Sequence, residues 1–192
     1  MMKRALLILV AILVILAGII VSRPDTFSVS RSAIIAAPPA VVYAQVADFA
    51  AWQAWSPWGK LDPAMKTTYG GTPGQPGATY AWVGNKDVGE GRMTIVKVDP
   101  PSLVDINLEF IKPFPATNDT AFAFAPSGPG TLAMWTMTGH NNFMTKAMSL
   151  FSSMDKMIGP DFEKGLAQLK TVSESAATQV AAAPAPSPAP AK

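Results

Sequence analysis

The sequence predicts an α+β fold, in which a curved antiparallel sheet wraps around a long C-terminal helix and two short helices follow the first strand. Seven strand-like segments succeed one another with short, turn-rich connections, which is typical of an antiparallel sheet. Near the end of the chain, apolar residues recur every three or four positions, as on one face of a helix. Such a helix must bury its apolar stripe, and the concave face of the sheet is the only large apolar surface available.

The N-terminal segment from Ala5 to Val21 is uninterrupted apolar sequence and predicts one membrane-spanning helix. At 1.5 Å per residue it spans about 25 Å, near the lower limit for a hydrocarbon core of ~30 Å. A cleavable signal peptide is the alternative, but its apolar part is usually shorter and ends in a small-x-small site that residues 19–23 lack. A buried core helix is a poor third interpretation, because no face of the segment is polar. We therefore expect an uncleaved anchor within residues 1–22.

The charges around this segment bear on its orientation. Lys3, Arg4 and the α-amino group precede it, whereas Arg23 and Arg31 follow it. The positive-inside bias favours a cytoplasmic N-terminus. The sequence therefore predicts a single-pass protein of the inner (cytoplasmic) membrane, with its domain on the extracytoplasmic side.

Residues 25–35 alternate with period two and predict the first strand. Pro38-Pro39 opens a short helix that continues over residues 40–49, since proline is tolerated in a first turn. A second short helix or turn covers residues 50–58. The remaining strands are expected at residues 66–69, 79–83, 91–98, 103–110, 117–125 and 131–139.

The periodic apolar residues between Met144 and Leu169 predict one long helix, with a kink expected at Gly159-Pro160 because proline removes a backbone donor. The folded domain is expected over residues 23–173. Residues 174–192 are rich in alanine and proline and predict a disordered tail.

Composition excludes several functions. The chain has no cysteine and a single histidine, so disulfides, thiolate chemistry and a two-histidine metal site are impossible. Net charge is +2 and 15% of residues are charged, without the concentrated Lys/Arg patch that a nucleic-acid-binding face needs. No phosphate-loop spacing of glycines is present. We expect no metal, no cofactor and no nucleic-acid partner, and oligomeric state stays open.

Several residue runs follow the same order and spacing as in a known superfamily. They are Ile34-Ile35-Ala36-Ala37-Pro38, Val46-Ala47-Asp48-Phe49, Trp55-Ser56-Pro57-Trp58, Asp62-Pro63, Tyr69-Gly70-Gly71, Trp82-Val83-Gly84-Asn85, Gly89-Glu90-Gly91 and Met154 to Leu166. With the element order, they make the chain resemble the helix-grip superfamily, called START/Bet v 1-like or SRPBCC, over residues 27–172. Within it the chain is similar to the bacterial polyketide cyclase/dehydrase-like group. The resemblance implies a cavity between sheet and C-terminal helix, in a superfamily that carries lipids or hormones, cyclises polyketides or binds chaperones.

Apolar side chains with an adaptable or aromatic character are the candidates for lining that cavity. They are Trp55, Trp58, Trp82, Met93, Phe110, Met134, Met148 and Phe151. The tryptophans, including Trp52, have an alternative role as packing anchors that staple the short helices to the sheet. The methionines serve equally well as ordinary core filler.

Three residues are the weak candidates for acid–base chemistry. Glu90 lies between two glycines, which equally mark a turn or a bulge. Asp155 falls on the apolar stripe of the last helix, with Arg92 as its expected partner. His140 follows Gly139 in a polar segment, where a solvated histidine is the simpler interpretation.

Two main functions remain open at this point. The first is a membrane-tethered carrier for a small apolar or lipid-like ligand, supported by the anchor from Ala5 to Val21 and the aromatic and methionine content. The second is a polyketide cyclase/dehydratase-like enzyme that uses a cavity carboxylate or His140. A protein-interaction domain is a third option. An enclosed carboxylate or imidazole would favour chemistry, and an apolar lining would favour carriage.

Overall fold

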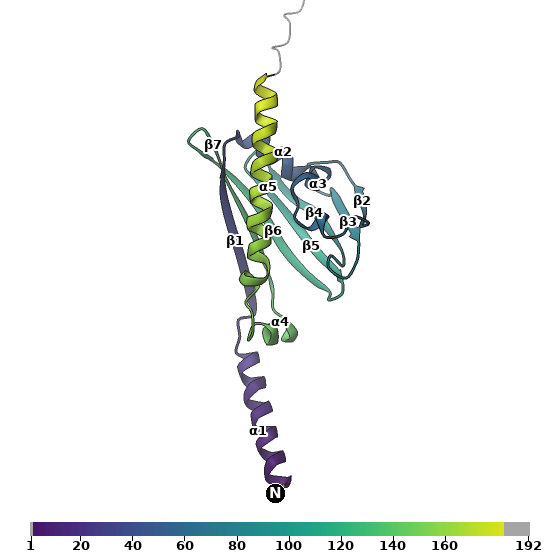
Figure 1. Ribbon diagram of the computed structural model, residues 1–192, viewed down its shortest axis with the longest axis vertical. Helices are drawn as coiled ribbons and strands as arrows, with labels where there is room; N and C mark the ends of the chain where they lie inside the picture. The colour runs from purple at the N-terminus through teal and green to yellow at the C-terminus, as the bar shows by residue number, and fades with distance from the viewer. Residues whose placement is uncertain (1, 183–192) are drawn as a thin grey trace, which may run out of the picture.

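The computed structural model describes residues 2–182 and has the predicted α+β architecture (Figure 1). Seven antiparallel strands form one sheet in the order β1-β7-β6-β5-β4-β3-β2. Their bounds are Thr26–Ile35 (β1), Lys66–Gly70 (β2), Thr79–Val83 (β3), Glu90–Asp99 (β4), Leu103–Lys112 (β5), Ala116–Ser127 (β6) and Gly130–His140 (β7). Each strand overlaps the segment predicted for it, because period-two alternation on a half-buried sheet is a strong local signal.

Short helical segments fill the connection between β1 and β2. They are α2 (Pro39–Ala47), the 3-10 turn η1 (Phe49–Ala51), α3 (Trp52–Trp55) and the 3-10 turn η2 (Trp58–Lys60). Pro39 stands in the first turn of α2, where its missing N–H costs nothing. The side chain of Asp48 accepts a hydrogen bond from the Ala50 N–H at 2.9 Å and so caps η1. The predicted pair of short helices is therefore present.

The long C-terminal helix α5 (Met154–Ala182) packs against β1 and α2. It buries a stripe that includes Phe162, Leu166 and Leu169. Figure 1 shows α5 running along the sheet and past its upper edge. Pro160 lies in its second turn, and the helix continues beyond it.

Two boundaries of this helix differ from the prediction. Residues 143–153 are separate: α4 (Phe143–Met148) is capped by the Asn142 side chain, and Ser153 Oγ accepts from the Lys156 N–H at 3.3 Å. Serine and asparagine at these positions favour helix starts, so the apolar periodicity breaks into two helices. At the other end, residues 174–182 are helical rather than part of a disordered tail, because alanine-rich sequence readily extends a helix. The rest of the predicted tail lies outside the described residues.

The N-terminal helix α1 (Met2–Val21) projects away from the domain (Figure 1). It is long and apolar enough to cross a membrane, with a mean hydropathy of 3.0 over an 18-residue window. Its side chains are exposed apart from Ile20, which lies next to the domain. A signal sequence near an N-terminus would pass the same test of length and composition.

Candidate functional site

The space between the sheet and α5 is filled by aromatic side chains. Trp135 from β7 stacks on Phe162 from α5, with ring centroids 4.0 Å apart and an angle of 7° between the planes. Phe122 from β6 stacks on the other side of Trp135 at 4.7 Å. All three are buried to 2% exposure or less. Close-packed rings leave no room for a ligand at this point of the helix-grip core.

Trp52 and Trp55 join this packed core from α3. The indole N–H of Trp52 donates to the Val46 carbonyl at 2.8 Å, and that of Trp55 donates to the Gln45 carbonyl at 2.9 Å. These bonds satisfy carbonyls in the last turn of α2, which the helix itself leaves unpaired. Trp52 and Trp55 thereby staple the short helices to the sheet.

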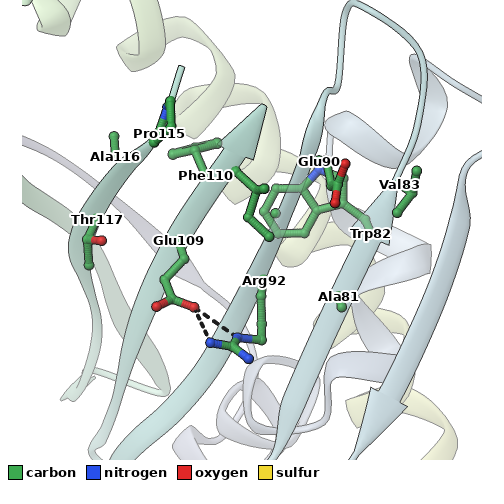
Figure 2. A pocket seen from close by; sticks show the side chains of 12 residues that line it. Ala81, Trp82, Val83, Glu90, Arg92, Glu109, Phe110, Pro115, Ala116 and Thr117 are labelled. Carbon is green, nitrogen blue, oxygen red and sulfur yellow. Dashed lines mark hydrogen bonds and ion pairs between the residues drawn. The ribbon is translucent and has the colours of Figure 1, made fainter. Parts of the chain in front are cut away.

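An open cleft of about 530 Å³ lies at one end of the sheet, across β3, β4, β5 and the start of β6 (Figure 2). Trp82 and Phe110 lie toward one end of the cleft in Figure 2, and Arg92 and Glu109 lie toward the other. Glu90 also lines it. Along the strands Arg92 and Glu109 alternate with Gly91 and Phe110, so the ion pair lies on the face of the sheet opposite to the rings of Trp82 and Phe110.

Trp82 is held in place by strand β4. Its indole N–H donates to the Val88 carbonyl at 3.0 Å. Its ring passes over Gly91, where an added Cβ would overlap the ring carbons. Phe110 packs edge-on against Trp82, with centroids 6.1 Å apart. The missing side chain at Gly91 therefore creates the space in which the ring lies.

Tyr80 stacks on Trp82 from the same strand, at 5.9 Å. Burial raises the pKa of Tyr80 to about 12, and the neighbouring Tyr69 hydroxyl adds to the shift. The phenol of Tyr80 therefore stays neutral at physiological pH and acts as part of the aromatic packing.

Two ion pairs supply the charge of the cleft. Arg92 Nη2 lies 2.6 Å from Glu109 Oε2, and Arg92 Nε donates to the same oxygen at 2.9 Å. Lys112 Nζ lies 2.7 Å from Glu90 Oε2. Glu90 stands at a register shift between β4 and β5, next to Gly89 with φ +65°. The bulge interpretation of the two glycines is therefore confirmed.

The cleft is at the end of the sheet from which α1 departs. Phe110 near the end of β5 pairs with Ala116 at the start of β6. Two residues further along β6, Asn118 pairs with Gly139 on β7, and Gly139 pairs with Phe27 near the start of β1. Only four residues separate the end of α1 from the start of β1. Figure 1 shows these strand ends on the side of the domain that faces α1.

The structure distributes the predicted lining residues over three environments. Trp82 and Phe110 line the cleft. Trp55 and Met93 are buried in the core, and Trp58 packs edge-on against Trp135. Met134, Met148 and Phe151 do not line the interior: their exposed fractions are 40%, 44% and 92%. Met134 alternates with the buried Ala133 and Trp135 and so faces away from α5, while Met148 and Phe151 lie in and after α4.

The three acid–base candidates are not brought together. Glu90 lines the cleft, whereas His140 ends β7 at an exposed position. Asp155 is paired with Arg31 at 2.7 Å, not with Arg92 as expected, because α5 packs along β1. Arg31 also donates to Glu163 at 2.7 Å. The hydrogen bond from Arg31 and then its charge lower the pKa of Asp155.

Arg31 and Glu109 were absent from the site prediction, and Arg92 was named only as the expected partner of Asp155. A signal for Arg31 was present in the sequence, because it shares the period-two phase of Phe27 and Val29 and therefore faces α5. Arg92 and Glu109 lie on opposite strands, and nothing local indicates that Glu109 pairs with Arg92. Within residues 2–182, no cluster of three His, Asp or Glu side chains is arranged to hold a metal ion.

A family model described as polyketide cyclase / dehydrase and lipid transport matches residues 26–174. The chain belongs to this family. The match begins at the first residue of β1 and ends inside α5, so it covers the sheet, the short helices and the packed half of α5. The predicted membership of the SRPBCC superfamily is therefore confirmed. No curated protein matches the chain.

Solved structures of low sequence identity share the fold. A protein of unknown function from Staphylococcus aureus is 14% identical with a TM-score of 0.59, covering 81% of this chain and 97% of its own. Ara h 8.0201 is 12% identical with a TM-score of 0.53, over 80% and 99%. The di-domain ARO/CYC StfQ from the steffimycin biosynthetic pathway is 11% identical with a TM-score of 0.57. The match covers 80% of this chain but about half, 52%, of StfQ. The family member described here thus has the predicted helix-grip, Bet v 1-like fold.

Proposed function

We propose that this family member is a membrane-tethered domain that binds a small apolar or lipid-like ligand in the cleft of Trp82 and Phe110. The observation that carries the proposal is the position of this cleft at the end of the sheet nearest α1. A helix that spans the bilayer would hold the cleft close to the membrane surface. Ligands dissolved in or adsorbed to the bilayer are then the ones it meets.

The composition of the cleft supports an amphipathic ligand. The rings of Trp82 and Phe110 offer apolar area, and the Trp82 N–H is already bonded to Val88. The Arg92–Glu109 pair, about half and one third exposed, lies on the opposite face of the sheet, because Arg92 and Glu109 alternate with Gly91 and Phe110 along their strands. An acyl or polycyclic body would rest against the rings, with its head in solvent at the strand ends.

Binding is favoured over catalysis by the state of the two carboxylates. Glu90 and Glu109 are each held by a cation at 2.6–2.7 Å. A carboxylate oxygen that already contacts a cation is less free to take a proton from a substrate. The one observation that favours an enzyme is that Glu90 lines the cleft.

The test uses the full chain in phosphatidylcholine nanodiscs, with a fluorescent long-chain fatty acid as the probe. We expect saturable binding that Trp82→Ala weakens, because the ring forms part of the cleft. Met134→Ala is the matched control, since Met134 is on the other face of the sheet. Equal affinity in both variants, or no saturable binding in the unmodified chain, would contradict the proposal.

The enzyme alternative has a separate test. If Glu90 transfers protons, Glu90→Gln abolishes turnover of a linear polyketide substrate and leaves its binding intact. If the domain only binds, the unmodified chain and Glu90→Gln convert such a substrate equally slowly.

The anchor and its orientation are also part of the proposal. The intact mass of the chain extracted from membranes distinguishes a retained α1 from a cleaved signal peptide. Since the chain has no cysteine, Ile34→Cys introduces one thiol at a 60% exposed position of the domain. Its labelling by a membrane-impermeant maleimide in intact cells is expected if the domain is extracytoplasmic, and protection would reverse the orientation.

A further inference from the structure

A second apolar surface lies beside the domain end of α1. The connection between β7 and α5, residues 143–151, comprises α4 and the turn after it and is called the connector below. Four large apolar side chains of the connector are exposed: Phe143 by 59%, Met144 by 57%, Met148 by 44% and Phe151 by 92%. Soluble domains seldom expose such a concentration of apolar residues without a partner for it.

The connector is fixed to the end of α1. Lys146 from α4 donates to the Val21 carbonyl at 3.4 Å, and its ammonium also pairs with Asp25. The Lys146 side chain is only 11% exposed, and this contact lowers the pKa of Asp25. Just before α4, Asn141 donates to the Asp25 carbonyl at 2.8 Å and, through its side chain, to the Pro24 carbonyl at 3.0 Å. Val21 and Asp25 are therefore bonded to the connector through Lys146, and Pro24 and Asp25 are bonded to Asn141 just before it.

The length of α1 sets the depth of the connector. The apolar part of α1, from Ala5 to Val21, is about 25 Å long, near the lower limit for a hydrocarbon core of ~30 Å. With α1 across the membrane, Val21 lies where the acyl chains meet the headgroups. Because Lys146 contacts Val21 directly, α4 lies at the same level. Figure 1 shows α4 between the sheet and α1, next to the upper end of α1.

We propose that the connector inserts Phe143, Met144, Met148 and Phe151 into the lipid interface, as a second membrane contact beside α1. The occupant of this apolar surface is the bilayer itself, since the surface is continuous with the lipid-facing surface of α1. Phe114, 71% exposed in the turn between β5 and β6, lies at the same end of the sheet. A lysine beside aromatic and methionine side chains suits the boundary between headgroups and acyl chains.

Two contacts with the bilayer restrict the domain more than one. A single helix lets the domain tilt about residues 22–25, whereas the connector fixes which strand ends point at the membrane. Those ends carry the cleft of Trp82 and Phe110. The cleft would then open toward the lipid surface, and a ligand could pass between bilayer and cleft without crossing bulk water. This inference rests on the membrane tether in the proposed function.

The experiment exploits the lack of cysteine in the chain. Three single-cysteine variants of the full chain, Phe151→Cys, Val180→Cys and Leu13→Cys, are labelled with the polarity-sensitive dye NBD. Each is reconstituted into phosphatidylcholine vesicles with and without 5-doxyl-phosphatidylcholine. All three positions are exposed in the structure, at 92%, 69% and 54%, so the labels should not disturb folding. Val180, on α5 beyond the sheet, is the control for a label in water. Leu13, in α1, is the control for a label in lipid.

The expected result is blue-shifted emission that doxyl lipid quenches at Phe151 and Leu13, with red, unquenched emission at Val180. Quenching at Leu13 with water-like emission at Phe151 overturns the second contact but leaves the tether intact. Blue-shifted emission at Phe151 that doxyl lipid does not quench means that a protein, such as a second copy of this chain, covers the connector, and also overturns the inference. Absence of quenching at Leu13 overturns the tether, and the second contact with it.

A second variant tests the consequence for ligand transfer. Phe143→Ser with Phe151→Ser keeps the fold, because both side chains are already exposed. We expect slower transfer of the fluorescent fatty acid from vesicles to the cleft and unchanged affinity in detergent. An unchanged transfer rate would show that the connector does not orient the cleft.

Discussion

The two ends of the domain use aromatic side chains in opposite ways. Around Trp135, the rings of Phe122 and Phe162 stack at 4.7 and 4.0 Å and fill the space between sheet and α5. The rings of Trp82 and Phe110 instead border an open cleft. The same fold is therefore closed where α5 crosses the sheet and open where the strands end near α1. A residue's type does not reveal which of these roles it has, but its neighbours do.

The largest effect is expected from emptying the closed end. Trp135→Ala removes a ring that contacts both Phe122 and Phe162 and should lower the free energy of unfolding by about 3–5 kcal/mol. Urea unfolding of the full chain in detergent measures it. The control is Trp135→Phe, which should cost much less, because the buried Trp135 N–H has no hydrogen-bond partner among the described residues. A small loss in Trp135→Ala would mean that the stack is not the core of the domain.

A smaller effect is expected from closing the open end. Gly91→Ala places a methyl group where the Trp82 ring lies and should cost about 1–3 kcal/mol as the ring shifts. The shifted ring should also weaken binding of the fluorescent fatty acid. Gly59→Ala is the matched control, since an added Cβ there meets no atom within 4 Å. If Gly91→Ala binds the probe normally, the ring of Trp82 does not shape the binding site.

Acid titration tests the ion pair between Arg31 on β1 and Asp155 on α5. Because Arg31 holds the pKa of Asp155 below its ordinary value of 3.8, the Arg31–Asp155 pair stabilises the fold above that pH. The stabilisation is lost as the pH falls through the lowered pKa, over a range of about pH 5 to 2. Asp155→Asn should flatten the fall in unfolding free energy in this range. Arg31→Gln should flatten it as well, because it removes the cation that lowers the pKa of Asp155. If the unfolding free energy of Asp155→Asn fell with pH as steeply as that of the unmodified chain, the stabilising role of the Arg31–Asp155 pair would be contradicted.

The smallest effect is expected at the rim of the cleft. Arg92→Ala breaks an ion pair whose side chains are 53% and 34% exposed, so it should change the unfolding free energy by only about 0.2–1 kcal/mol. Affinity for a fatty acid and for the corresponding fatty alcohol should both stay the same, because Arg92 lies on the face of the sheet opposite to the rings of Trp82 and Phe110. A loss of affinity for the fatty acid alone would show that the guanidinium contacts the head group.

Period-two and helical patterns located the elements because they are local properties of the chain. The predicted strand at residues 79–83 coincides with β3, and the others differ by one or two residues at their ends. The prediction failed where local signals competed. The apolar periodicity of residues 144–169 indicated one helix, yet Ser153 begins a new one, because a capping side chain outweighs periodicity over a single turn.

The candidate site was harder to predict because it depends on contacts between distant residues. Trp82 and Phe110 were predicted to line a cavity between the sheet and the C-terminal helix; they border a cleft at the strand ends instead, and their role in ligand binding stays a prediction. Met134 was assigned to the interior, but the phase of β7 turns it to the opposite face, and only the register with β1 and β6 reveals that phase. Phe151 follows a helical spacing that would bury it if α5 began ten residues earlier; instead it is 92% exposed in the connector.

The sequence by itself determined the element order, the apolar helix at the N-terminus and the helix-grip fold, since each follows from periodicity, composition or the order of residue runs. Only the tertiary structure decided where the domain is closed and where it is open. That choice depends on ring stacking between β7 and α5, on the space above Gly91 and on the bonding of Lys146 to the end of α1. These contacts join residues up to 125 positions apart, a distance over which no local pattern carries information.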